Sequence, residues 1–241
     1  MEIIIVENYK ELSQKAAEIF LNQLNIKLNS VFGLSTGSTP VGLYNKVVEL
    51  YKKGGYDFSF VKTFNLDEYY LISSENKNSY HFFMNDVLFN HINVDKKNIF
   101  IPDGEVKDCD AFCDWYEKEI SNNPIDLQIL GIGENGHIGF NEPGSSLDSK
   151  TRLVDLSPET IKINSRFFDD KNNIPRQAIT MGIDTILKAK NILFLASGAK
   201  KAKAVYDMIY GNISLDCPAS ALQRHKKVLV ILDKDAAELL K

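Results

Sequence analysis

The sequence predicts an α/β protein with a single domain, residues 1–241, built on a doubly wound, mainly parallel sheet of modified Rossmann-like type with helices on both faces. Short apolar runs alternate with longer amphipathic segments along the chain, which is typical of βαβ units. The 241 residues are 44% hydrophobic and 25% charged, which is ordinary for a globular protein. No linker-like, low-complexity or repeated segment divides the chain, and its length allows one large core.

Seven short apolar runs are the predicted strands, and the amphipathic segments between them are the predicted helices. In the first helix, Leu12, Ala16 and Phe20 recur every four residues, as on a buried helix face. A Ser or Thr N-cap with Pro40 in the first turn predicts where the second helix begins. The predicted strands are 3–6, 31–34, 61–66, 99–101, 126–132, 191–196 and 228–232, the third ending in Asp67-Glu68-Tyr69. The predicted helices are 9–28, 41–53, 80–90, 108–121, 184–188, 200–210 and 236–240.

A glycine-rich segment, residues 131–143, follows the fifth predicted strand and contains four glycines, His137 and Glu142. Right-handed crossovers place all strand carboxyl ends at one edge of the sheet, where open α/β sheets bind ligands. His137 could move a proton near neutral pH, and Glu142 could orient it. The alternative is a glycine-rich connection with a solvent-facing histidine.

The loop after the second predicted strand, residues 34–40, reads Leu-Ser-Thr-Gly-Ser-Thr-Pro. Free backbone N–H groups and hydroxyls at a helix start favour binding of a phosphate. The loop lacks the dinucleotide and Walker patterns, so a phosphomonoester fits better than a nucleotide. A plain Ser/Thr N-cap is the alternative. The candidate phosphate-binding residues here are Ser35, Thr36, Gly37, Ser38 and Thr39.

Two further segments carry charged candidates. Asp67 and Glu68 are adjacent carboxylates at a strand end, where a raised pKa would suit a general base, although a solvated turn is the alternative. Arg166 and Lys200-Lys201 could complete a phosphate site, although most single cations lie on the surface.

The composition excludes several classes of function. The net charge is −4 without a basic stripe, so no nucleic acid is expected as a partner. No apolar run is long enough to span a membrane, and the first residues are too acidic for a signal peptide, so a cytoplasmic location without membrane partners is expected. Neither the three cysteines nor the four histidines have metal-ligand spacing. We therefore expect no metal and no cofactor.

Four motifs together carry a family resemblance: residues 34–40, 64–69, 136–143 and 164–168. In this order and spacing they resemble the glucosamine-6-phosphate deaminase (isomerising) family, in its short, non-allosteric type. The resemblance runs from the first strand to Asp233. It implies an enzyme of amino-sugar catabolism that converts glucosamine 6-phosphate to fructose 6-phosphate and ammonia without an organic cofactor. It also implies a monomer or a weak homo-oligomer.

The resemblance implies a role for each matching residue. Asp67 would move a proton between C2 and C1, and His137 would assist ring opening with Glu142 as its partner. The 35–39 loop, Arg166 and Lys201, rather than Lys200, would hold the phosphate.

The chain departs from the family at two places. Asn135 stands where many members have an aspartate, and we expect it to orient His137 by hydrogen bonds. Because the chain lacks the C-terminal extension of the allosteric members and has Val154 at an activator-site position, no activation by N-acetylglucosamine 6-phosphate is expected. Residues 145–175 are a candidate lid.

Two alternatives remain open at this stage. One is a 6-phosphogluconolactonase-like sugar-phosphate hydrolase, which would not need Asp67 as a proton carrier. The other is a sugar-phosphate-sensing domain of the kind found in transcriptional regulators. Such a sensor should be fused to a DNA-binding helix-turn-helix, and the first predicted strand begins too early to leave room for one.

Overall fold

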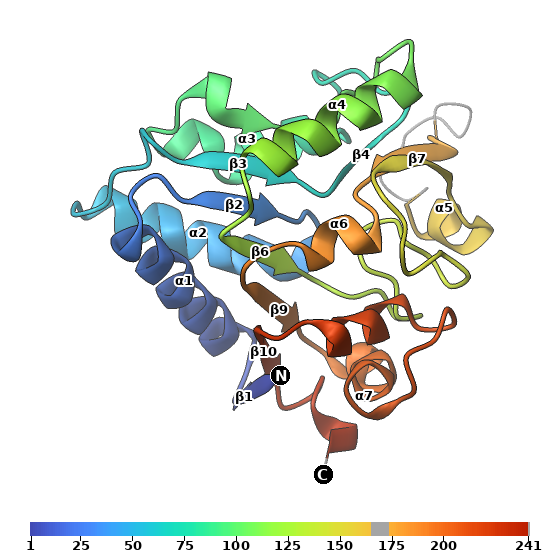
Figure 1. Ribbon diagram of the computed structural model, residues 1–241. Helices are drawn as coiled ribbons and strands as arrows, with labels where there is room; N and C mark the ends of the chain where they lie inside the picture. The colour runs from blue at the N-terminus through green and yellow to red at the C-terminus, as the bar shows by residue number, and fades with distance from the viewer. Residues whose placement is uncertain (165–173, 241) are drawn as a thin grey trace.

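The structure, a computed structural model, describes residues 1–164 and 174–240 (Figure 1). Its centre is a sheet of seven strands, all paired in parallel. They are β1 (Glu2–Val6), β2 (Val31–Leu34), β3 (Lys62–Asn65), β5 (Ile99–Phe100), β6 (Leu127–Leu130), β9 (Ile192–Ala196) and β10 (Val228–Asp233). Their order across the sheet is β1-β10-β9-β6-β2-β3-β5. The predicted doubly wound α/β fold is confirmed.

Helices cover both faces of this sheet, as predicted. One hydrophobic cluster joins the sheet to α1 (Tyr9–Ile26), α2 (Ser38–Lys52) and α3 (Tyr80–Val87). A second cluster joins the opposite face to α4 (Cys109–Asn122), α6 (Ile183–Leu187) and α7 (Ala202–Tyr210). None of the helices in the described ranges is both long and apolar enough to cross a membrane.

Capping residues explain most helix starts, and one exception bears on the site. Asn8 Oδ1 accepts the N–H of Glu11 at the start of α1, and Asp108 Oδ1 accepts that of Ala111 at the start of α4. The predicted Ser or Thr cap of α2 is wrong, because Gly37 is the N-cap and no side chain caps this helix. Helix α2 therefore begins at Ser38, earlier than predicted, and its first hydroxyls do not fold back onto its own backbone.

The prediction that the third strand ends in Asp67-Glu68-Tyr69 is also wrong. Strand β3 ends at Asn65, and β4 (Asp67–Tyr69) belongs to a second, antiparallel sheet with β8 (Gln177–Thr180) and β7 (Arg152–Asp155). Its three short strands come from distant parts of the chain. Because local periodicity cannot report pairing between such segments, the sequence did not predict this sheet.

The remaining elements differ from the predictions mainly by short 3₁₀ turns. Helix 80–90 is α3 followed by η1 (Phe89–His91), helix 200–210 begins with η5 (Ala199–Lys201), and helix 236–240 is reduced to η7 (Glu238–Leu240). The predictions of a lid at residues 145–175 and of a single domain over residues 1–241 stay predictions. Besides the strands β7 and β8 of the small sheet, the structure adds three elements that were not predicted: α5 (Pro158–Asn164), η2 (Lys96–Asn98) and η6 (Pro218–Arg224).

The small sheet anchors the glycine-rich loop. Asp67 and Arg152 both pair with Thr180, so all three side chains share one face of this sheet. The backbone N–H of Phe140 donates to Thr180 Oγ1 at 3.1 Å, and the guanidinium of Arg152 donates to Asn141 Oδ1 at 2.9 Å. The loop that carries His137 is thereby tied to the sheet that carries Asp67.

Replacement of Thr180 by valine tests this anchor. Thr180→Val leaves the buried N–H of Phe140 without its acceptor, so the free energy of unfolding should fall by about 1–3 kcal/mol. Thr180→Ser, which keeps the hydroxyl, should lose less. Urea denaturation measures both variants, and equal losses would contradict the role of the hydroxyl.

Candidate active site

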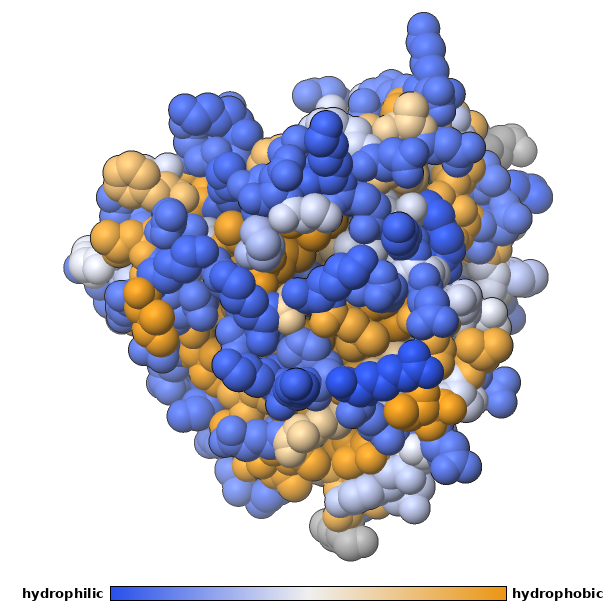
Figure 2. All heavy atoms as spheres, in the orientation of Figure 1, coloured by the Kyte–Doolittle hydropathy of each residue, from blue (hydrophilic) through white to orange (hydrophobic). Residues whose placement is uncertain are grey.

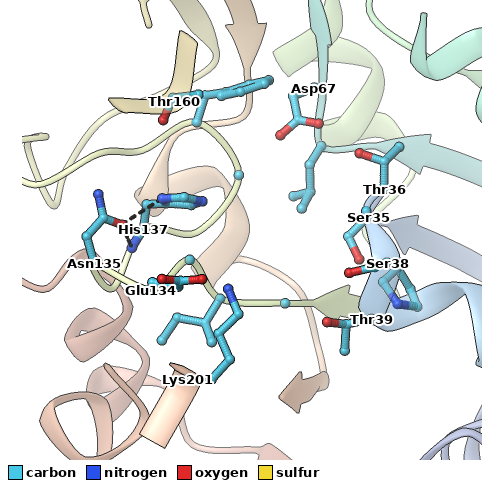
Figure 3. A pocket seen from close by; sticks show the side chains of 18 of the residues that line it. Ser35, Thr36, Ser38, Thr39, Asp67, Glu134, Asn135, His137, Thr160 and Lys201 are labelled. Atoms are coloured by element: carbon cyan, nitrogen blue, oxygen red, sulfur yellow. Dashed lines mark hydrogen bonds between the residues drawn. The ribbon is translucent and has the colours of Figure 1, made fainter. Parts of the chain in front are cut away.

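The candidate site is a pocket at the carboxyl ends of β9, β6, β2 and β3 (Figure 3). Strands β2 and β6 are neighbours, and after them the chain continues toward opposite edges of the sheet. The position between their carboxyl ends is therefore the topological switch point of the sheet. The cavity has a volume of about 370 Å³, enough for a small molecule. It is lined by nine predicted residues: Ser35, Thr36, Gly37, Ser38, Thr39, Asp67, Asn135, His137 and Lys201.

The pleat of β4 separates the two adjacent carboxylates. Glu68 is buried and turns away from Asp67, and its oxygens accept from Ser79 Oγ at 2.7 Å and from the N–H groups of Tyr69, Tyr80 and His81 at 2.8, 3.0 and 3.0 Å. Glu68 thus holds the start of α3 and has a structural role. Asp67 is the carboxylate that lines the pocket.

Burial gives Asp67 the properties of a base. Its side chain is 5% exposed. Burial, together with the negative charge of Glu68, raises the pKa of Asp67 from 3.8 to about 8. A carboxylate with a pKa in this range binds a proton far more strongly than an exposed one does.

His137 is held through Asn135 rather than by Glu142 alone. The Nδ1 of His137 lies 2.7 Å from Asn135 Oδ1 and 3.5 Å from Glu142 Oε2. The Nδ2 of Asn135 donates to Glu142 Oε2 at 2.8 Å. Asn135 therefore links the histidine to the carboxylate, and Glu142 lies behind this pair, outside the lining of the pocket.

Glu142 stays ionised at any pH near neutral. Its burial acts to raise the pKa, but the interaction with His137 and the hydrogen bonds from Thr160 and Asn135 outweigh burial and lower the pKa to about 2. Two carboxylates of one site therefore have pKa values shifted in opposite directions. Such a separation is typical of groups with different roles in acid–base chemistry.

Two glycines allow the close approach of these groups. A Cβ at Gly133 would lie 2.1 Å from Cε1 and 2.2 Å from Nδ1 of His137, so the imidazole occupies the space that a side chain would need. Gly139 has a φ of 57°, and a Cβ there would lie 3.2 Å from Asp67 Oδ2.

The opposite end of the pocket is suited to an anion. The loop before α2 and the start of this helix present hydroxyl and N–H groups, and Ser35 Oγ is buried without a partner in the described part of the chain. Lys201 lies beside them on η5, and burial lowers the pKa of its ammonium. Lys200 is largely exposed and lies 4.0 Å from Glu134.

Sequence reasoning missed some residues, and one predicted residue cannot be placed. Arg166 lies outside the described residues. Thr160, Tyr80 and Glu134 line the pocket but were not predicted. Glu134 lies in the glycine-rich segment 131–143, and Ser157 and Thr160 are spaced like a helix cap, a pattern that does not distinguish capping from contact with a site. Within residues 1–164 and 174–240, no His, Cys, Asp and Glu side chains are grouped as metal ligands.

Comparison with known proteins identifies the family. Residues 7–231 match the family model described as glucosamine-6-phosphate isomerases/6-phosphogluconolactonase. The chain belongs to this family. Among its relatives, the glucosamine-6-phosphate deaminase of Halothermothrix orenii is 52% identical, with all of both chains covered. That of Clostridium botulinum (strain Eklund 17B / Type B) is 51% identical, covering all of this chain and 97% of the relative.

Solved structures of the family agree with this assignment. A structure described as a monomeric glucosamine-6-phosphate deaminase superposes with a TM-score of 0.96 at 46% identity, covering 99% of this chain and all of the other. The 6-phosphogluconolactonase of Trypanosoma cruzi superposes with a TM-score of 0.78 at 23% identity, covering 100% of this chain and 97% of the other, and so shares the fold alone.

Replacement of Gly133 by alanine should displace His137. The new Cβ would overlap the ring, so we expect the imidazole NMR signals of His137 to move more than those of the other histidines. The free energy of unfolding should fall by about 1–3 kcal/mol, as in an overpacked core. Gly131→Ala is the matched control, because a Cβ at Gly131 meets nothing within 4 Å. Equal effects of the two substitutions would contradict this account.

The raised pKa of Asp67 predicts a pH-dependent stability. Between the unfolded pKa of 3.8 and the folded pKa of about 8, the folded protein retains a proton that the unfolded chain has lost. This contribution to stability is complete below the unfolded value and is lost as the pH rises, by at most about 1.4 kcal/mol per pH unit.

The variant Asp67→Asn has no carboxyl group at this position, so the folded and unfolded proteins no longer differ by this proton. Its free energy of unfolding relative to the wild type should therefore increase from about pH 5 to about pH 8. Exposed Asp148 provides the control, because Asp148→Asn should give a difference that does not change over this range. Denaturant titrations at several pH values measure both, and a constant difference for Asp67→Asn would refute the raised pKa.

Proposed function

We propose that this protein is a glucosamine-6-phosphate deaminase of the isomerising type. One observation supports this most directly: the buried carboxylate of Asp67, on β4, and the imidazole of His137, on the glycine-rich loop after β6, reach into the same pocket, which a loop suited to an anion also lines. The high identity to named deaminases across the whole chain favours this activity over the lactonase activity that the family also includes.

The first proposed step is opening of the sugar ring. Because Asn135 Oδ1 accepts from Nδ1 of His137, the free nitrogen of the neutral ring is Nε2. We propose that Nε2 takes the proton of the O1 hydroxyl and that the imidazolium then gives this proton to the ring oxygen. The C1–O5 bond breaks and C1 becomes an aldehyde. Glu142, ionised near neutral pH, stabilises the imidazolium that forms.

The second proposed step moves a proton along the open chain. Asp67 removes the proton from C2, which is acidified by the adjacent aldehyde, and returns it to C1. The aldehyde oxygen takes a proton from the ammonium group of the substrate to form an enol, and after Asp67 protonates C1, C1 is a hydroxymethyl group and C2 an iminium. Water adds to C2, and ammonia and a proton leave, which gives fructose 6-phosphate. Because the net reaction uses water to break a C–N bond, we also propose a hydrolase classification.

The phosphate end supplies orientation. We propose that Ser35, Thr36, Gly37, Ser38 and Thr39 hold the phosphate with Lys201, and that Arg166 adds a second cation. Binding energy from the phosphate then holds C2 at Asp67, remote from the phosphate itself. We also propose that the chain acts as a monomer or a weak homo-oligomer.

Release of ammonia from glucosamine 6-phosphate tests the proposal. The wild-type protein should release ammonia and fructose 6-phosphate in equal amounts, and Asp67→Asn should lower kcat by about 10²- to 10⁴-fold with its fold retained. Circular dichroism checks the fold, and Asp148→Asn should keep full activity. Hydrolysis of 6-phosphogluconolactone without ammonia release, or full activity in Asp67→Asn, would contradict the proposal.

A further inference from the structure

The hydrogen bonds behind His137 extend beyond the pocket to α5. Glu142 presents its two oxygens in opposite directions: Oε2 faces Asn135 and His137, whereas Oε1 accepts from the hydroxyl of Thr160. We propose that Thr160 is a positioning residue that, through Glu142 and Asn135, fixes which nitrogen of His137 carries the proton. The inference rests on the proposed role of His137 as the base for ring opening.

Thr160 is suited to hold a carboxylate in one orientation. It lies in the first turn of α5 and is 8% exposed. Ser157 Oγ donates to Thr160 Oγ1 at 3.0 Å and accepts the backbone N–H of Thr160 at 3.1 Å. Ser157 therefore caps the helix and orients the threonine hydroxyl. The proton of Thr160 Oγ1 is left for Glu142, whose Oε1 lies 3.5 Å from Ser157 Oγ.

The direction of each hydrogen bond follows from the chemistry of the groups. An ionised carboxylate only accepts, so Glu142 Oε2 must face the Nδ2 donor of Asn135. The amide oxygen of Asn135 then points at Nδ1 of His137 and can only accept. Nδ1 is therefore the protonated nitrogen of the neutral ring, and Nε2 is free to act as a base.

An asparagine makes this chain sensitive to Glu142. The two ends of a carboxamide have nearly the same shape, so a reversed Asn135 would present a donor to Nδ1 and favour the opposite tautomer. Two contacts with described residues oppose this reversal: Glu142 Oε2 accepts from Nδ2 at 2.8 Å, and the backbone N–H of His137 donates to Oδ1 at 3.2 Å. Anything that lets the carboxylate rotate, such as loss of the Thr160 hydroxyl, weakens the first contact and so reduces the selection of one tautomer.

The decisive experiment compares the imidazole of His137 in the wild type and in Thr160→Val. Long-range ¹H–¹⁵N NMR of the free protein at about pH 9, where histidine is neutral, distinguishes the two tautomers. The wild type should show Nδ1 protonated, and Thr160→Val should show averaged ¹⁵N shifts of a mixture. With glucosamine 6-phosphate, kcat of the variant should fall about ten- to a hundredfold, while KM changes by less than about threefold.

A matched control separates positioning from simple loss of stability. Thr185, on α6, is also buried and donates to Glu117 of α4, a carboxylate outside the pocket. Thr185→Val should lower stability without changing the ¹⁵N shifts of His137 or kcat. Thr160→Ser, which keeps the hydroxyl, should restore the wild-type tautomer. If Thr160→Val does not fold, Thr160→Ala serves as the test variant.

The outcomes are distinct. Unchanged ¹⁵N shifts of His137 in Thr160→Val would overturn the inference, even if kcat falls, because Thr160 would then act directly on the substrate. A tautomer mixture in Thr185→Val would also overturn it. The NMR measurement needs no substrate, so it tests the positioning of His137 by Thr160 independently of activity. A wild-type protein that releases no ammonia would refute the proposed function, whereas the ¹⁵N shifts alone would decide the role of Thr160.

Discussion

The antiparallel pairing of β4 with β8 is the interaction on which the candidate site depends. It places Asp67 opposite Thr180, on the face where the glycine-rich loop lies. The hydroxyl of Thr180 then accepts from Phe140, and Gly139 leaves the space that Asp67 occupies. Without this second sheet, Asp67 would be the end of a strand in the main sheet, with no fixed relation to His137.

Hydrogen bonds distinguish two neighbouring carboxylates that are both buried. Glu68 receives four hydrogen bonds and holds the start of α3, whereas the carboxylate of Asp67 is buried beside it and faces the pocket. The carboxylate of Asp67 therefore costs stability when it is ionised, because burial disfavours its charged form. Glu142 shows a third situation, in which hydrogen-bond donors and His137 lower its pKa by more than burial raises it. The hydrogen-bond donors around each carboxylate, rather than its residue type, therefore determine its role in the site.

Much of this could be predicted from local sequence. All seven strands of the main sheet were predicted, because apolar runs with buried faces leave a local pattern. The glycine-rich loop, the loop before α2 and Asp67 were predicted as site residues because the carboxyl ends of parallel strands share one edge. Thr160 and Tyr80 were missed, since each reads locally as an ordinary residue in the first turn of a helix. The predicted N-cap of α2 was wrong because the sequence allows either Gly37 or a residue with a hydroxyl to precede the helix.

The sequence by itself determined the fold class, the family and the set of chemical groups available. Those properties depend on short-range periodicity and on residue types, which are present in the linear chain. The residues by themselves did not distinguish Asp67 from Glu68, although the family resemblance named Asp67. The tertiary structure shows that Asp67 faces the pocket and that Asn135 lies between Glu142 and His137. It also brought Thr160 to Glu142. These outcomes depend on strand pairing and on hydrogen-bond direction between distant segments, and no local pattern records either of them.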